Sequence, residues 1–311
     1  MRGVGRRVAI TGYGVVAPCG IGKEAFWKGL NGPGLTGGRT IEVADWDPLP
    51  YFDNNPKEAR RADRVEQFAV AAAAECFEHA GRPDVSPDRI GTIVGTGVGG
   101  LRSIEDQIEV MIEKGERRVS PFLVPMMMAN ASGAAISMRY GLQGPNETIC
   151  TACAAATHAI GYAARMISWG MIDACVSGGS ESAGCRIGVN SFGNMTALST
   201  AGHSKPFSPE RDGFVLGEGA AIFMLEAWDL AVARGANIVG EVLGAASNAD
   251  AHHITAPAPG GTIAIEGMEL ALADAGLSPS DIGQVNAHGT STPLNDAAED
   301  RKSTRLNSSH T

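Results

Sequence analysis

The stretch over residues 146–169 constrains the fold of this chain more than any other. It begins with an apolar, strand-like run that ends at Thr151, and it passes at Cys153 into a helix of small and apolar residues that stops before Gly170. A thiol at the start of a helix lies near unpaired backbone N–H groups and the positive end of the helix dipole, and both favour the thiolate. Three successive alanines at 154–156 indicate that another backbone or a ligand packs very close to this helix. The stretch therefore predicts a buried cysteine nucleophile.

Strand-like and helix-like segments alternate along most of the chain. Strands are indicated by four apolar runs, at residues 89–95, 172–177, 220–225 and 282–287. The alternation predicts an α/β fold with a largely parallel sheet covered by helices on both faces. In such sheets ligands bind beyond the carboxyl ends of the strands, and Cys153 and His288 each follow such an end. This shared position, rather than either residue alone, favours a Cys/His site.

Length and composition limit the class of protein. A chain of 311 residues with 44% hydrophobic residues, 41 glycines and 19% charged residues is typical of a tightly packed α/β enzyme, as one large domain or two similar halves. No apolar run reaches membrane-spanning length, and the N-terminus lacks the apolar core of a signal peptide, so we expect a cytoplasmic protein. A formal charge of −9 argues against general binding to nucleic acid or acidic membranes.

The cysteines and histidines raise the alternatives of a metal site and a redox site, but their spacing argues against both. The chain has six cysteines, which in this context are expected to be reduced thiols. Cys150 and Cys153 form a C-x-x-C motif, but a zinc site needs a second ligand pair, and a redox helix usually starts at the first cysteine. His252 and His253 are adjacent and point in different directions on most backbones. We expect no metal site.

Three further motifs have structural explanations. Residues 95–100 are rich in glycine but lack the dinucleotide fingerprint and the Lys-Ser/Thr of a phosphate-binding loop, so close backbone contact explains them better. Residues 178–181 lack the last glycine of a hydrolase nucleophile elbow. The methionine-rich segment 119–138 is typical of core filling, although it can also line a pocket for a flexible apolar chain.

Three motifs in one order resemble those of the β-ketoacyl-acyl-carrier-protein synthases. They are Thr151-Ala152-Cys153, the run ERDGFVLGEG at 210–219 and the run NAHGTSTP at 286–293. The similarity spans residues 6–301 and is strongest to the elongating enzymes of type II fatty-acid synthesis, with type II polyketide ketosynthases close behind. The resemblance implies the thiolase-like fold, in which two similar α/β halves stack as five layers, α-β-α-β-α, within a homodimer.

The resemblance also implies a mechanism. Cys153 would take an acyl chain from acyl carrier protein as a thioester, and its backbone N–H would belong to the oxyanion hole. His288 would be one of two histidines that hydrogen-bond the thioester oxygen while malonyl-carrier protein loses carbon dioxide. The resulting carbanion would attack the Cys153 thioester and lengthen the chain by two carbons. Neutral donors in a dry site would stabilise the developing oxyanion, and no metal or other cofactor is implied beyond the phosphopantetheine that carries the substrates.

Substrate-binding residues follow from the same resemblance. Thr290 and Thr292 match residues that hydrogen-bond the phosphopantetheine arm, and Thr255 matches one near the tunnel mouth. Val119 and Met126 fall in the segment that lines the acyl pocket across the dimer interface.

Basic residues are candidates for docking the carrier protein, because that partner is acidic. The candidates are Arg60, Arg61, Arg64 and Lys205, and the alternative is that they are ordinary solvated surface.

The sequence departs from the family pattern after Asp300. The family would continue through a helix to a lysine and the second catalytic histidine, whereas residues 302–311 are polar and aperiodic. We therefore predict an N-terminal ketosynthase half at 1–237, the start of a C-terminal half at 238–301 and an unrelated tail at 302–311. The second half would be incomplete, with an exposed sheet edge, and this chain would be inactive in condensation although its full-length parent would be active.

Two other classes of protein share features with this chain. A thiolase or acyl-CoA condensing enzyme has the same fold but pairs its nucleophile with different motifs. A non-catalytic chain-length factor of a polyketide synthase typically lacks the nucleophile, and Cys153 argues against it.

Overall fold

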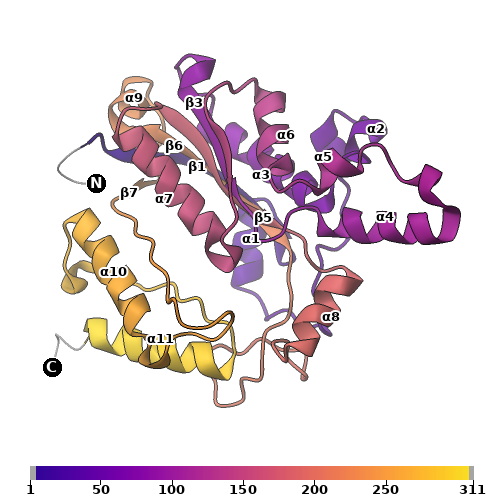
Figure 1. Cartoon of the computed structure of the whole chain (residues 1–311). Coiled ribbons are helices and arrows are strands. Elements are labelled where there is room, and N and C mark those ends of the chain that lie inside the picture. The colour runs from indigo at the N-terminus through magenta and orange to yellow at the C-terminus, as the bar shows by residue number, and fades with distance from the viewer. Residues whose placement is uncertain (1–4, 308–311) are drawn as a thin grey trace.

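A mixed β-sheet forms the centre of the molecule (Figure 1). The computed structural model describes the backbone of residues 5–307 and the side chains up to residue 300. Within this part, seven strands are arranged in the order β2-β1-β6-β5-β3-β4, and β7 pairs with β1 on the same edge as β2. The strands are β1 (Val8–Ala17), β2 (Gly20–Ile21), β3 (Ile90–Gly95), β4 (Asn146–Ile149), β5 (Ala174–Glu181), β6 (Gly219–Ala227) and β7 (Gly240–Val242).

Two long helices cover the two faces of the sheet, as predicted. Helix α3 (Arg64–Ala80) packs on one face and α7 (Ala155–Ser168) on the other (Figure 1). The other helices are α1 (Lys23–Leu30), α2 (Pro56–Ala59), α4 (Leu101–Lys114), α5 (Leu123–Met127), α6 (Ala131–Tyr140), α8 (Arg186–Asn194), α9 (Trp228–Ala233), α10 (Thr262–Ala275) and α11 (Pro293–Asn307).

The alternation of side chains along the strands builds a core on each face. On β3, Ile90 and Val94 join the cluster under α3, whereas Ile93 points to the cluster under α7. Because β3 is buried on both faces, its sequence is continuously apolar rather than alternating. This is why the run was recognisable as a strand.

The sheet is mixed, whereas the sequence predicted a largely parallel one. Strand β3 pairs in parallel with β4 and β5, but the other neighbouring strands are antiparallel. A parallel pair needs a crossover that carries the chain back along the sheet, as α7 does before β5. Between β5 and β6 the chain instead forms α8 and an irregular loop, so it re-enters the sheet from the same end and runs in the opposite direction.

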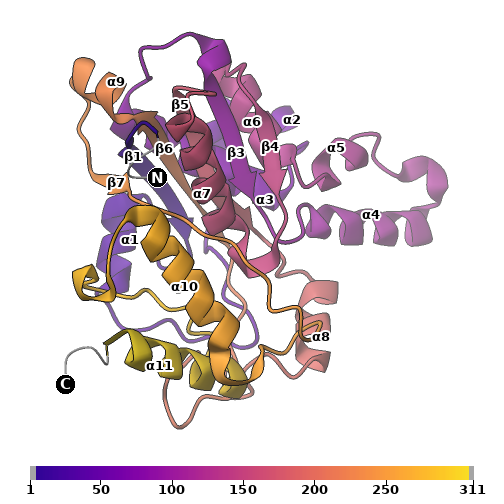
Figure 2. The ribbon, with the colours of Figure 1, turned by 60° about the vertical axis from the view of Figure 1, so that its left-hand side comes forward.

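The region after β7 contains helices α10 and α11 but no second sheet within the described residues. The two helices lie next to each other beside the sheet (Figures 1 and 2). The strand predicted at 282–287 does not form, and Ile282 and Val285 are exposed. A strand needs a neighbour to pair with, and no described strand pairs with this segment.

The last helix is longer than predicted. Helix α11 continues through residues 302–307, where the sequence predicted an aperiodic tail, and no proline or glycine interrupts it after Pro293. Residues 308–311 of that predicted tail lie outside the described residues.

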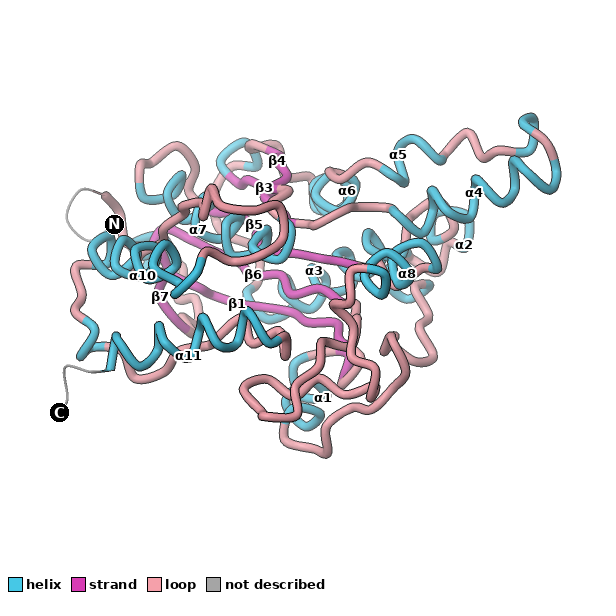
Figure 3. The backbone as a smooth tube through the Cα atoms, turned by 60° about the horizontal axis from the view of Figure 1, so that its bottom comes forward, coloured by secondary structure: helices cyan, strands magenta, loops and turns pink. Residues whose placement is uncertain are grey.

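Helices α4 and α5 form an arm that extends away from the body (Figure 3). The arm exposes large apolar side chains on both helices and on the chain that follows α5. They include Ile108, Ile112, Val124, Met127 and Met128. An apolar surface of this kind is typical of a contact with another protein.

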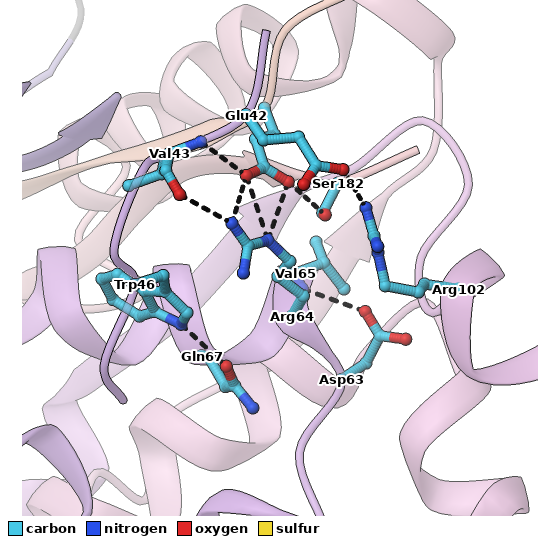
Figure 4. Close-up of polar contacts among 10 residues, drawn as sticks. Glu42, Val43, Trp46, Asp63, Arg64, Val65, Gln67, Arg102 and Ser182 are labelled. Atoms are coloured by element: carbon cyan, nitrogen blue, oxygen red, sulfur yellow. Dashed lines mark hydrogen bonds and ion pairs between the residues drawn. The ribbon is translucent and has the colours of Figure 1, made fainter. Parts of the chain in front are cut away.

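A buried ion pair ties the start of α3 to the start of β6. Arg64 Nε donates to Glu218 Oε2 at 2.9 Å, and Glu218 also accepts bonds from the Val43 N–H and the Ser182 hydroxyl, each at 2.8 Å (Figure 4). Burial raises the pKa of Glu218, but these three donors outweigh it and hold the pKa below its ordinary value. The carboxylate is therefore fixed in its charged form.

Replacing Arg64 with methionine should lower the free energy of unfolding by about 3 kcal/mol, because the buried Glu218 charge would lose its cation. Urea denaturation at pH 7 measures the change. The matched control is Arg60→Met, at an exposed position on the same segment, and it should cost less than about 0.5 kcal/mol. Equal losses in the two variants would contradict a structural role for the ion pair.

Candidate active site

Three parallel strands end at the same level and bring three loops together. In the register of the sheet, Gly95 at the end of β3 lies opposite Ile149 of β4 and Gly179 of β5. The chain leaving β4 leads to Cys153, the chain leaving β3 forms the glycine-rich loop 95–100, and β5 ends with Glu181. The carboxyl edge predicted for the site is therefore formed by β4, β3 and β5.

Cys153 lies in a single 3-10 turn, Ala152–Ala154, that leads directly into α7. The turn is tight, since Ala152 has a φ of 50°, a left-handed conformation that is costly for a residue other than glycine. The predicted close packing of this helix is confirmed. A Cβ atom on Gly95 would lie 2.4 Å from the carbonyl carbon of Ala155, and one on Gly179 would lie 2.6 Å from the Cβ of Ala156. Only glycines let α7 approach the sheet this closely.

The structure brings Cys153 and His288 together, with their side chains hydrogen-bonded. This bond is the main reason that the pKa of the Cys153 thiol lies below its ordinary value, while partial burial and the negative charge of Glu181 act in the opposite direction. The predicted burial of the thiol is wrong, because Cys153 is exposed. Residues 150–154 and 282–286 are all exposed, so the described chain leaves the Cys153 turn open to solvent.

Two carboxylates hold the loop that carries His288. Glu299 accepts the His288 N–H at 2.8 Å and the Gly289 N–H at 2.7 Å. Asp296, which is buried, accepts the Ser291 N–H at 3.1 Å and the Phe207 N–H at 2.8 Å. The sequence reasoning missed both residues. Their signal was an acidic pair three residues apart in the first two turns of a helix that follows the His288 loop.

Comparison with known proteins places this chain in a family. The model for the β-ketoacyl synthase N-terminal domain matches residues 35–231, and the model for the C-terminal domain matches residues 239–311. The chain belongs to the β-ketoacyl synthase family. The bounds predicted for the halves, 1–237 and 238–301, and the foreign origin of 302–311 remain predictions.

Curated relatives and solved structures agree with this assignment. A 3-oxoacyl-[acyl-carrier-protein] synthase 2 from Synechocystis sp. is 41% identical over 95% of this chain and 76% of its own length. The protein of the same name from Vibrio cholerae is 42% identical over 94% of this chain and 75% of its own. The structure of the ishigamide ketosynthase/chain length factor superposes with a TM-score of 0.87 at 32% identity, covering 97% of this chain and 78% of that one. The predicted thiolase-like α/β fold class is confirmed.

The residues expected to bind substrate in this family are spread over three segments. The Thr290 and Thr292 hydroxyls are 2.8 Å apart and half-buried, on the same loop as His288. Thr255 is exposed, and its N–H donates to His253 Nδ1 at 3.1 Å. That bond gives His253 a structural role in its own loop.

Val119 and Met126 lie on the arm rather than on the site-bearing edge, and both are half-buried. The Met126 backbone packs against Gly100, where a Cβ atom would lie 2.2 Å from the Met126 carbonyl oxygen. The roles of all five substrate-binding candidates remain predictions.

The four docking candidates differ in accessibility. Arg60 and Arg61 are exposed, and the Arg61 guanidinium lies 4.0 Å from the centre of the Phe122 ring. Lys205 is half-buried and paired with Glu210 at 2.5 Å. The prediction for Arg64 is wrong, because its guanidinium is engaged in the buried pair with Glu218 and is not available to a partner.

The remaining predictions concern metals, thiols and membranes. All six cysteines are free thiols, and Cys76, Cys175 and Cys185 are buried. In the described part of the chain, no group of three or more histidine, cysteine or acidic side chains could hold a metal ion. A search of the same residues finds no helix with the length and apolarity needed to cross a bilayer.

Replacing His288 with alanine should raise the pKa of Cys153, since the bond that most lowers it is lost. Alkylation by iodoacetamide, followed against pH by peptide mass spectrometry, should show a midpoint below the ordinary value of about 8.5 in the parent and a higher midpoint in the variant. The control is His158→Ala, because the His158 ring bonds the Thr151 hydroxyl rather than the thiol. A midpoint that does not move in His288→Ala would contradict the pairing.

Proposed function

We propose that this chain carries the nucleophile site of a β-ketoacyl-acyl-carrier-protein synthase of fatty-acid elongation, an acyltransferase whose complete reaction is a decarboxylative Claisen condensation. The observation that carries the proposal is the Cys153 thiol at the start of α7, hydrogen-bonded to His288, in a chain about 40% identical to curated 3-oxoacyl-[acyl-carrier-protein] synthases. A thiol with a lowered pKa at a helix start is a nucleophile, and the imidazole is a donor to an oxyanion.

The first half-reaction is acyl transfer to sulfur. The Cys153 sulfur attacks the carbonyl carbon of the acyl thioester, and the Cys153 N–H stabilises the tetrahedral oxyanion. The bond from that carbon to the phosphopantetheine sulfur breaks, and the departing thiolate takes up the proton that the Cys153 thiol has lost. The chain is left as a thioester on Cys153.

The second half-reaction forms the carbon–carbon bond. The malonyl group loses carbon dioxide, and the electron pair of the broken bond becomes an enolate whose oxygen is hydrogen-bonded by His288. The enolate carbon attacks the Cys153 thioester, and the sulfur leaves. The product is a β-ketoacyl group two carbons longer on the carrier protein. These steps need no metal or organic cofactor, because the thioesters themselves supply the activated carbonyl carbon.

A type II polyketide ketosynthase is the second candidate. A structure of a type II polyketide acyl-carrier protein in complex with its ketosynthase superposes with a TM-score of 0.86 at 30% identity. The higher identity to the fatty-acid relatives favours elongation of fatty acids. A chain-length factor is disfavoured by the presence of Cys153.

We also propose that two copies associate through the open edge of the sheet and the arm. Among the described strands, β4 is the last in the sheet and its outer edge has no partner strand, and the arm exposes apolar side chains. Sedimentation velocity would distinguish this dimer from a monomer.

The six free thiols support a reducing, cytoplasmic location.

Incubation with acyl-[acyl-carrier protein] should add one acyl group to the intact chain, detected by mass spectrometry as a thioester on Cys153. This half-reaction needs the sulfur and amide of Cys153, which the structure describes. Cys153→Ala should abolish the adduct, whereas the control Cys150→Ala, three residues away, should retain it. Addition of malonyl-carrier protein then tests condensation, and a β-ketoacyl product would contradict the inactivity predicted for this chain. An adduct on another residue would contradict the proposal.

Reversing the charge of the exposed pair, Arg60→Glu with Arg61→Glu, should raise the KM for acyl-[acyl-carrier protein] by about ten-fold, because an acidic partner loses two cations. The KM for the corresponding acyl-CoA should stay unchanged. Lys28→Glu, at an exposed position on α1, is the control for charge alone. Equal effects on both acyl donors would reject Arg60 and Arg61 as the docking site.

A further inference from the structure

A carboxylate at the end of β5 faces the same edge as Cys153 and has no role in the steps above. Glu181 Oε2 accepts the Gly97 N–H at 2.8 Å and the Val98 N–H at 3.1 Å, and the Thr96 hydroxyl lies 3.3 Å away. One carboxylate oxygen therefore gathers three donors from the loop that leaves β3. These amides have no strand partner beyond the end of the sheet, and the carboxylate satisfies them instead.

The loop held by Glu181 lies against the nucleophile turn. A Cβ atom on Gly97 would be 2.9 Å from Glu181 Oε2 and 3.8 Å from the Ala152 Cα. Gly97 is therefore packed between the carboxylate and the residue that precedes Cys153. Ala152 is the residue with the left-handed backbone, so the loop supports the part of the turn that is most costly to maintain.

The carboxylate itself is anchored to the body of the protein. Glu181 Oε1 accepts the Ser182 N–H at 3.0 Å, and the Ser182 hydroxyl donates to Glu218 at 2.8 Å. Glu218 is in turn held by Arg64. A continuous polar chain thus runs from the start of α3 through the end of β5 to the loop beside Cys153. A carboxylate held at both oxygens in this way is fixed beside the loop.

We infer that Glu181 is a positioning residue of the proposed reaction, which holds the loop 96–98 against the Cys153 turn and places a fixed negative charge near the sulfur. The inference rests on the proposed function in one respect, that Cys153 is the nucleophile. Nothing in the sequence indicates this role, because the Gly-Gly-Ser-Glu run at 178–181 matches only an incomplete hydrolase elbow.

The fixed charge has a chemical consequence. Among charged or titratable groups, His288, from the loop before α11, has the largest effect on the thiol and lowers its pKa, whereas Glu181, from β5, has a smaller effect and raises it. The next such groups along its own segment are Cys150 and His158, and His158 is bonded to Thr151. Intrinsic nucleophilicity falls as the pKa of a thiol falls, so a thiolate made too stable by His288 would attack a thioester slowly. Glu181 opposes that outcome.

The test uses the full chain carrying Cys150→Ser, so that alkylation of Cys153 is measured alone. Glu181→Gln keeps an acceptor but removes the charge. Its alkylation by iodoacetamide should be about two-fold faster at pH 7, because a larger share of the thiol is ionised, and the midpoint of the pH profile should move to lower pH. Glu181→Asp keeps the charge but is too short to reach both amides. Its alkylation profile should stay close to that of the parent, while its acylation by acyl-[acyl-carrier protein] slows.

The matched control is Glu105→Gln. Glu105 also accepts two successive backbone N–H groups, those of Arg186 and Ile187, but it serves the start of α8 rather than the Cys153 turn. This variant should leave both measurements unchanged. Thermal unfolding establishes that each variant is folded. If Glu181→Gln does not fold, Glu181→Asp still decides the positioning role.

Two results would overturn the inference. An alkylation profile of Glu181→Gln that superimposes on the parent removes the electrostatic role, and unchanged acylation in Glu181→Asp removes the positioning role. Alkylation needs no acyl substrate. A parent chain that is alkylated at Cys153 but accepts no acyl group would therefore contradict the proposed function and leave the effect of Glu181 on the thiol measurable.

Discussion

The site depends on the close packing of α7 against the ends of β3 and β5. Gly95 and Gly179 carry no side chain, so the first turn of α7 rests directly on the sheet backbone. This contact places the start of the helix, with its unpaired N–H groups, at the carboxyl edge of three adjacent parallel strands. A methyl group at either glycine would clash with atoms of Ala155 or Ala156 and push the start of α7 off the sheet. The position of Cys153 therefore follows from close packing.

Loops beyond the sheet are ordered here mainly by carboxylates that accept pairs of backbone N–H groups. Glu181 does so for residues 97 and 98, and Glu299 does so for residues 288 and 289. Asp296 joins two distant loops in the same way. Such loops have no ladder to satisfy their amides, and a carboxylate has two oxygens that can each take several donors. His288 thus lies on a loop fixed by Glu299, and Cys153 lies beside a loop fixed by Glu181.

Two residues change the stability of the Cys153 thiolate in opposite directions. His288 stabilises the thiolate and Glu181 destabilises it, and the two residues lie on different segments of the fold. Deeper in the protein, the buried Arg64–Glu218 pair anchors the end of β5 through Ser182. Arg64, which the sequence predicted to contact the acidic carrier protein, therefore stabilises the end of β5 next to the site. Arg60 and Arg61 are exposed and remain candidates for docking that partner.

The sequence by itself determined the elements with strong local patterns and predicted that Cys153 and His288 share a site. The apolar run of β3, the small-residue helix α7 and the motifs around Cys153 and His288 were all readable, because periodicity and residue type are local properties. Tertiary structure alone decided the direction of β6, the absence of a strand at 282–287 and the exposure of Cys153. Each of these depends on which neighbour is present. It also decided the roles of Arg64, Glu181 and Glu299, because a charged side chain looks the same in a sequence whether it faces solvent, a buried counter-ion or a backbone amide.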